Sequence, residues 1–144
     1  MILLDTVVLS ELRRSQPDAS VVAFIKAQNP EHVFLSVVTL AEIEAGIEKL
    51  RKLAAPHQQT FSLELQAWLA ALELTYAPRI LPITTPIAKT FGRLSAQLGN
   101  QSMDLLIAAT ALHHNLVVVT RNNSDFSPTG VQVLNPFNPS VPAS

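Results

Sequence analysis

Three short, almost purely apolar runs constrain the fold of this chain more than any other feature. They lie at residues 1–4, 33–35 and 116–119, and helical patterns separate them along the sequence. A strand without alternating polar residues is buried on both faces, and helices between such strands serve as the crossovers of a parallel sheet. The sequence therefore predicts an α/β fold, a doubly wound parallel sheet with helices on both faces.

Hydrophobic periodicity predicts five strands and six helices. Asp18 is the expected N-cap of the second helix, while Thr85 and Pro86 are expected to open the fifth, which Gly99 ends. The expected strands cover residues 1–5, 32–36, 116–120 and 131–134, and a further short strand in the segment RILPI at 79–83 is closed by Pro82. The expected helices cover residues 7–14, 18–28, 39–53, 85–98 and 102–115, and a further helix runs from residue 61 past residue 72.

Length and composition favour one domain over residues 1–137, followed by an irregular, proline-containing tail at 138–144. The chain has 15% charged residues and no cysteine, so a disulfide framework and a cysteine zinc site are excluded. No signal peptide or membrane span is expected, and the cytoplasm is the default location. The net charge of −1 gives no general attraction to nucleic acid, so RNA binding would need a local basic patch or a metal ion.

Four acidic residues, Asp5, Glu42, Asp104 and Asp125, fall where expected elements begin or end. In a doubly wound sheet these positions gather beyond the carboxyl ends of the strands, where ligands bind. Carboxylates that lie close together repel, and a cation makes that arrangement tolerable. Oxygen ligands without cysteine, and without histidine at a matching spacing, suit Mg²⁺ or Mn²⁺ better than zinc.

Three of the acids also have a structural interpretation. Thr39 and Glu42 have the spacing of a capping box, in which Thr39 caps the helix and Glu42 bonds back to the helix start. Asp104 could complement a helix dipole, and Asp125 could be a turn residue. Asp5 is the hardest to explain in this way, because it directly follows a buried strand.

Divalent ions at such a site could bind a phosphodiester, activate a water molecule and stabilise the leaving oxygen, which is nuclease chemistry. Thr6, Thr120 and Asn122 flank the expected site and could position water or a phosphate oxygen. Capping or turn formation explains these three residues equally well. Arg121 is a candidate for contact with an RNA phosphate.

The sequence also resembles a known family through motifs that cover nearly the whole chain. In order, they are MILLDTVVLSE, LSVVTLAEIEAGI, RILPI, MDLLIAATALHHNLVVVTRNNSDF and VQVLNPF. They are similar to those of the PIN-domain ribonucleases, in particular the VapC-type toxins of toxin-antitoxin pairs. The resemblance makes Asp5, Glu42 and Asp104 the acidic residues of the family, and Asp125 matches its more variable fourth acid. It implies an Mg²⁺- or Mn²⁺-dependent ribonuclease that forms a homodimer and is silenced by a cognate antitoxin.

Val7 departs from the family pattern, which usually has asparagine at this position. An amide there would help to hold the acidic cluster by hydrogen bonds, and valine can neither donate nor accept. A weakened ribonuclease and a PIN fold retained only for partner binding are therefore both open. A receiver-like binding module is a further alternative, but a receiver has two adjacent acids after its first strand, whereas Asp5 stands alone.

Overall fold

The computed structural model describes residues 1–53 and 55–137, and within them five parallel strands form one sheet. The strands are β1 (Ile2–Leu4), β2 (Val33–Ser36), β3 (Ile80–Leu81), β4 (Val117–Val119) and β5 (Val133–Leu134). Their order across the sheet is β3-β2-β1-β4-β5, and every neighbouring pair is parallel. The predicted doubly wound parallel sheet is confirmed, whereas the tail predicted at 138–144 lies outside the described residues.

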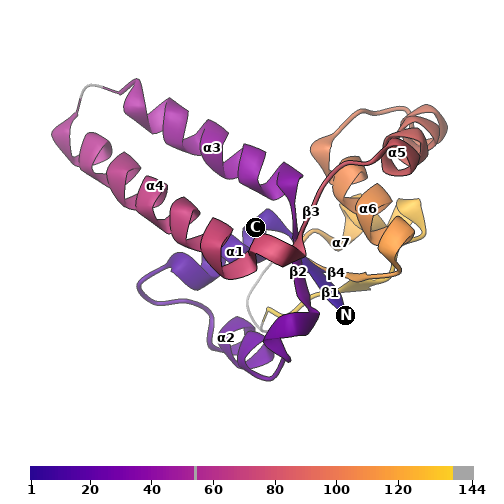
Figure 1. The fold of residues 1–144 in the computed structure, drawn as a ribbon, viewed down its shortest axis with the longest axis horizontal. Coiled ribbons are helices and arrows are strands. Elements are labelled where there is room, and N and C mark those ends of the chain that lie inside the picture. The colour runs from indigo at the N-terminus through magenta and orange to yellow at the C-terminus, as the bar shows by residue number, and fades with distance from the viewer. Residues whose placement is uncertain (54, 138–144) are drawn as a thin grey trace.

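Seven α-helices of the described chain connect and cover these strands. They are α1 (Thr6–Arg13), α2 (Ala19–Lys26), α3 (Val37–Arg51), α4 (Pro56–Tyr76), α5 (Thr85–Leu98), α6 (Met103–His114) and α7 (Asn123–Phe126). Helices α3 and α4 pack against each other as a long hairpin that extends away from the sheet (Figure 1). None of the described helices combines the length and the apolar character needed to cross a membrane.

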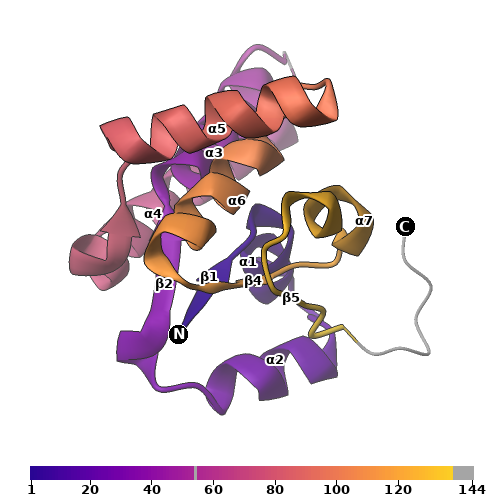
Figure 2. The same ribbon diagram turned by 90° about the vertical axis from the view of Figure 1, so that its right-hand side faces the viewer.

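The two faces of the sheet carry separate hydrophobic cores because side chains alternate along each strand. Leu4 and Val119 pack with buried residues of α1 to α4 on one face. Leu3 and Val118 pack with buried residues of α5, α6 and α7 on the other. Figure 2 shows this second layer, with α5 lying beside α6. All four side chains are fully buried, as the apolar runs predicted.

The central strand β1 borders the point where the strand order reverses. From β1 the chain continues to β2 and β3 on one side, then returns through α5 and α6 to β4 on the other. Leu4 pairs with Val119, and the Asp5 backbone N–H donates to the Val119 carbonyl oxygen at 2.9 Å. In open α/β sheets, ligands bind at this switch point, beyond the carboxyl ends of the strands.

The predicted cap at Asp18 and the predicted stop at Gly99 agree with the structure, but the predicted starts of α3, α4 and α5 were wrong. The Asp18 side chain accepts from the backbone N–H groups of Ser20 and Val21, so Asp18 caps α2 as predicted. Gly99 ends α5 with a φ of 71°, a conformation that glycine adopts without strain. Thr85, however, is the first residue of α5, and the preceding Thr84 makes no side-chain cap.

The end of β3 agrees with the prediction, whereas the presence of α7 differs from it. The strand expected to be closed by Pro82 is β3, which covers Ile80–Leu81, and Pro82 has no backbone N–H to donate. Asp125 was expected in a loop and instead lies in α7, a single helical turn. A four-residue helix is too short to produce a periodic pattern, so hydrophobic periodicity could not predict it.

The packing of α4 gives the first prediction, which compares two leucines two positions apart. Leu72 is 8% exposed and packs in the core of the α1-to-α4 face, whereas Leu74 is 83% exposed. Leu72→Ala should lower the free energy of unfolding by about 2 to 4 kcal/mol, because it leaves a cavity. Leu74→Ala should change it by less than about 0.5 kcal/mol. Urea denaturation of both variants is the measurement, and equal destabilisation would contradict the orientation of α4.

Candidate acidic site at the strand ends

Asp5 joins three elements of the structure through its backbone and its carboxylate. It is 4% exposed and follows β1 directly. Its Oδ1 accepts from the backbone N–H of Thr6 at 2.8 Å, which caps α1. Its Oδ2 accepts from the hydroxyl of Thr120, directly after β4, also at 2.8 Å. Since a carboxylate has about four acceptor positions, these two bonds leave capacity for a further ligand.

Glu42 is held toward the same region by the hydroxyl of Thr6. Thr6 Oγ1 lies 2.6 Å from Glu42 Oε1 and 3.1 Å from Thr39 Oγ1. A hydroxyl has one hydrogen, and a bond to a charged acceptor is the stronger one, so Thr6 donates to Glu42. This contact crosses from α1 to α3 and explains why both a threonine and a glutamate lie there.

The capping-box interpretation of Glu42 was wrong. Helix α3 begins at Val37, and its N-cap is Ser36, whose hydroxyl oxygen accepts from the Val38 backbone N–H at 3.0 Å. Thr39 is therefore inside the helix and fully buried. Glu42 lies in the second turn and bonds to Thr6, not to the start of α3. Its carboxylate serves a tertiary contact.

Asp104 and Asp125 approach from the opposite side of the switch point. Asp104 is the second residue of α6 and is half-buried, while Asp125 is exposed in α7. Both line one pocket of about 400 Å³, together with Leu98, Asn100, Ser102, Ser124 and Pro128. The end of α5 and the starts of α6 and α7 thus bring two carboxylates to a common cavity.

Two of the four acids, Asp5 and Asp104, have raised pKa values, and neighbouring carboxylates contribute to each rise. Burial is the largest cause that raises the pKa of Asp104 to about 6, and the negative charges of Asp5, Asp125 and Glu42 contribute to the rise. Burial also raises the pKa of Asp5; the bonds from Thr120 and Thr6 oppose this rise, and the charges of Glu42 and Asp125 add to it. The charges of Glu42 and Asp125 thus act on both Asp5 and Asp104, and these four residues make up the acidic cluster.

The donor set of this cluster fits a hard divalent cation in its chemistry. Carboxylates and threonine hydroxyls are oxygen donors, and raised carboxylate pKa values mark a place where positive charge would be stabilising. Within residues 1–53 and 55–137, no three acidic or histidine side chains converge closely enough to hold a metal ion as they stand. An ion would have to draw the carboxylates together.

Of the other predicted site residues, Thr6, Thr120 and Asn122 are connected to the acidic cluster by hydrogen bonds, whereas Arg121 lines another pocket. Thr6 and Thr120 bond the acids directly, and the backbone N–H of Asn122 donates to Thr120 Oγ1 at 3.0 Å. The Arg121 guanidinium lies over the Phe137 ring, 4.4 Å from its centre, and lines a different pocket of about 180 Å³. Thr39 contributes a contact that was not predicted, although it precedes Glu42 by three residues, on the same helix face.

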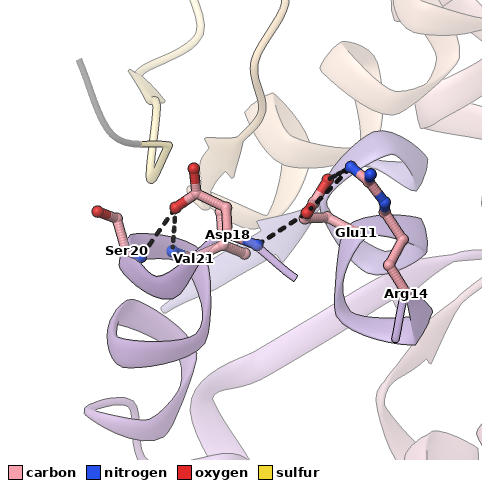
Figure 3. A network of polar contacts seen from close by, with 5 residues as sticks. All are labelled: Glu11, Arg14, Asp18, Ser20 and Val21. Atoms are coloured by element: carbon pink, nitrogen blue, oxygen red, sulfur yellow. Dashed lines mark hydrogen bonds and ion pairs between the residues drawn. The ribbon is translucent and has the colours of Figure 1, made fainter. Parts of the chain in front are cut away.

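A further buried carboxylate, Glu11, belongs to the corner between α1 and α2. It is 7% exposed and accepts from Arg14 Nη1 at 3.1 Å and from the backbone N–H of Asp18 at 2.8 Å. Asp18 in turn caps α2, so a chain of polar contacts connects the two helices (Figure 3). These bonds satisfy Glu11 locally, which explains its burial without a role in the acidic cluster.

Comparison with known proteins identifies the family of this chain. The PIN domain family matches residues 2–131. The VapC ribonuclease Y4jK of Sinorhizobium fredii is 36% identical over 96% of this chain and 99% of its own length. The toxin FitB of Neisseria gonorrhoeae is 34% identical over 96% of this chain and 99% of its own.

Solved structures agree in fold along nearly the whole chain. FitAcB from Neisseria gonorrhoeae superposes with a TM-score of 0.79 at 35% identity, covering 94% of this chain and 98% of that one. FitAB bound to a DNA fragment gives a TM-score of 0.78 at 33% identity, covering 96% of each chain. On its sequence and its fold, this chain belongs to the PIN-domain VapC family of toxins from toxin-antitoxin systems.

Proposed function

We propose that this chain is an endoribonuclease that hydrolyses RNA phosphodiester bonds with Mg²⁺ or Mn²⁺ and acts as the toxin of its pair. The observation that carries the proposal is the geometry of the four acids. Thr6 contacts both Asp5 and Glu42, and Asp104 and Asp125 line one pocket. A cation would offset the repulsion among carboxylates gathered in this way. The ribonuclease activity in the name of the Sinorhizobium relative supports the same function.

Asp5, Glu42 and Asp104 would hold the cation, with Asp125 completing the set from α7. A bound divalent ion would supply positive charge to the phosphodiester and lower the pKa of an attacking water. Thr120 fixes the orientation of the Asp5 carboxylate, and Thr6 does the same for Glu42. These hydroxyls keep the acids aimed at one region while the carboxylates repel.

The proposed partners follow from the relatives. The solved structures similar to this chain include FitAB bound to DNA and a toxin-antitoxin complex from Klebsiella pneumoniae. We propose that this chain likewise binds a cognate antitoxin, that it works as a homodimer, and that it acts on RNA in the cytoplasm. An antitoxin that covers the acidic cluster would block the approach of a strand.

Val7 is compatible with a weaker enzyme and with a binding-only role. Its side chain is partly buried against the core of the α1-to-α4 face, two residues after Asp5. Valine offers no hydrogen bond to the carboxylates, so Thr6 and Thr120 are the side chains that hold Asp5 and Glu42 among the described residues. The site thus depends on these threonines where relatives would add an amide.

Two carboxylate variants with a matched control test the activity. Asp104→Asn and Glu42→Gln should each reduce Mn²⁺-dependent cleavage of RNA by on the order of 100-fold or more, because each removes a charge that the cation needs. Glu44→Gln removes an exposed carboxylate from the same helix as Glu42 and should leave cleavage within twofold. Cleavage by the Asp104 and Glu42 variants at the parent rate, with unchanged Mn²⁺ affinity, would contradict the proposal.

The raised pKa of Asp104 gives a prediction for stability against pH. Its pKa rises from an ordinary value of 3.8 to about 6 in the folded chain, so the folded state binds the proton more tightly. The stability that this group contributes is complete below about pH 4 and is lost as the pH rises through about 6. In EDTA, the parent Tm should therefore fall over this range by a few degrees.

Asp104→Asn should make that fall shallower and should raise the Tm at pH 7 in EDTA. The slope should not vanish, because the pKa of Asp5 is raised as well. Saturating Mn²⁺ should stabilise the parent more than the variant at pH 7, since the ion binds only the folded state. Thermal melts with both proteins decide this; a variant that is less stable in EDTA at pH 7 would show that the Asp104 charge is not under strain.

Val7→Asn should restore the missing amide. We expect Mn²⁺ to bind about tenfold more tightly and cleavage to increase, because an amide can hydrogen-bond to the carboxylates that hold the ion. Val22→Asn, on α2, is the control for placing asparagine at a partly buried helical valine. Calorimetry that finds equal or weaker Mn²⁺ binding in the Val7 variant would mean that position 7 does not organise this site.

A further inference from the structure

A second pocket of about 400 Å³ lies along α5, at the far end of α6 from Asp104. It is lined by Thr85, Pro86, Lys89, Thr90, Arg93 and His113. All but His113 come from α5, and His113 is in the last turn of α6. Helices α5 and α6 lie side by side (Figure 2). One helix pair therefore carries this pocket at one end and the Asp104 pocket at the other.

The two helices that line this pocket carry Lys89 and Arg93, and their one acidic residue is Asp104, at the far end of α6. No acidic residue occurs between Glu73 and Asp104, and none between Asp104 and Asp125. Lys89 and Arg93 are exposed and lie one turn apart on α5. In the described part of the chain, the ion pairs join Arg14 and Arg51 to glutamates of their own helices or helix ends. Neither cation of α5 therefore pairs with a carboxylate among the described residues.

The donors of the pocket suit a phosphate group. Arg93 Nη2 donates to Thr90 Oγ1 at 3.1 Å, which holds the guanidinium beside the pocket and leaves its remaining N–H groups to bond a ligand. A guanidinium fork, an ammonium group and hydroxyls are the donors that bind phosphate oxygens in proteins. The lining contains no aromatic side chain besides the imidazole of His113 and only Pro86 as an apolar one, whereas the centre of a protein interface is apolar and rich in aromatic residues.

We propose that this pocket binds a backbone phosphate of the RNA strand, away from the bond that is cleaved. The proposal rests on the ribonuclease function proposed above and adds a second contact for its substrate. Asp104 and His113 are nine residues apart on α6, which corresponds to about 14 Å along the helix axis. A few nucleotides span that distance, so one strand can reach both places. The basic pocket would hold a strand that the acidic cluster repels.

The double variant K89Q/R93Q tests the pocket through RNA binding. In EDTA, where cleavage is prevented, we expect a single-stranded 12-nucleotide RNA to bind to the double variant on the order of tenfold more weakly than to the parent. The slope of log K against log salt should become shallower by about 0.7 for each phosphate that the variant no longer binds. K49Q/K52Q removes the same charge from exposed residues at the end of α3 and should bind RNA within twofold of the parent. Fluorescence anisotropy is the measurement.

Kinetics and a competing acidic probe separate the outcomes. With Mn²⁺, K89Q/R93Q should raise the KM for the 12-nucleotide RNA about tenfold and leave kcat within twofold, because these residues are remote from the reacting bond. An equally large decrease of RNA affinity in K49Q/K52Q would indicate general charge attraction and overturn the proposal. Unchanged RNA affinity with abolished binding of an oligoglutamate peptide would assign the pocket to an acidic protein and also overturn it.

The two proposals fail in different ways. If the parent binds RNA through Lys89 and Arg93 in EDTA but does not cleave it with Mn²⁺, the ribonuclease function is wrong and the phosphate pocket stands. If the parent cleaves RNA and the double variant binds and cleaves it equally well, the pocket assignment alone is wrong. The control is a thermal melt of each double variant. A Tm equal to that of the parent would show that the substitutions leave the fold intact.

Discussion

The site depends on the way in which Asp5 ties the central strand to its surroundings. Its backbone N–H continues the pairing of β1 with β4, one carboxylate oxygen caps α1, and the other accepts from Thr120. One residue therefore fixes the start of a helix, the end of one strand and the residue after another. Because β1 borders the switch point, this fixed carboxylate is also where a ligand of the sheet would bind. In the proposed function, the side chain that holds these elements together is thus also a ligand of the cation.

Fixing Asp5 in this way has an electrostatic cost that the hydrogen bonds only partly offset. Burial raises the pKa of its carboxyl group, and the bonds from Thr120 and Thr6 act in the opposite direction. For Asp104, burial and neighbouring charges all act to raise the pKa, which reaches about 6. The two acids therefore differ in how they are held: Asp5 is oriented by donors, while Asp104 is poised to gain most from a cation. In the proposed function, the fixed carboxylate of Asp5 would orient the cation. The Asp104 carboxylate, whose negative charge is disfavoured in the folded chain, would be stabilised when the cation binds.

The sheet and the position of the acids could be predicted from the sequence for the same reason. Runs without polar residues, such as the one before Asp5, are typical of a buried parallel sheet, and the ends of parallel strands meet at one edge. The partners across that edge could not be predicted. Thr39 and Glu42 have capping-box spacing, and nothing in the local pattern distinguishes that use from the contact of Glu42 with Thr6, which is 36 residues away. The helix around Asp125 was missed for a comparable reason, because α7 is a single turn whose existence depends on packing of Phe126.

The distribution of charge makes the proposed binding of an anionic RNA strand compatible with a net charge of −1. The acids of the site face one end of α6, and the cations of α5 lie toward the other, so the average charge describes neither place. Local potential, not net charge, decides where a polyanion is held, since screening limits exposed charges to a range of about 8 to 10 Å. At about 14 Å along α6 the two pockets are largely independent of each other in water. An RNA strand would thus be attracted to Lys89 and Arg93 whatever the charge of the acidic cluster. A bound cation would neutralise the acidic cluster, so that the strand could approach it.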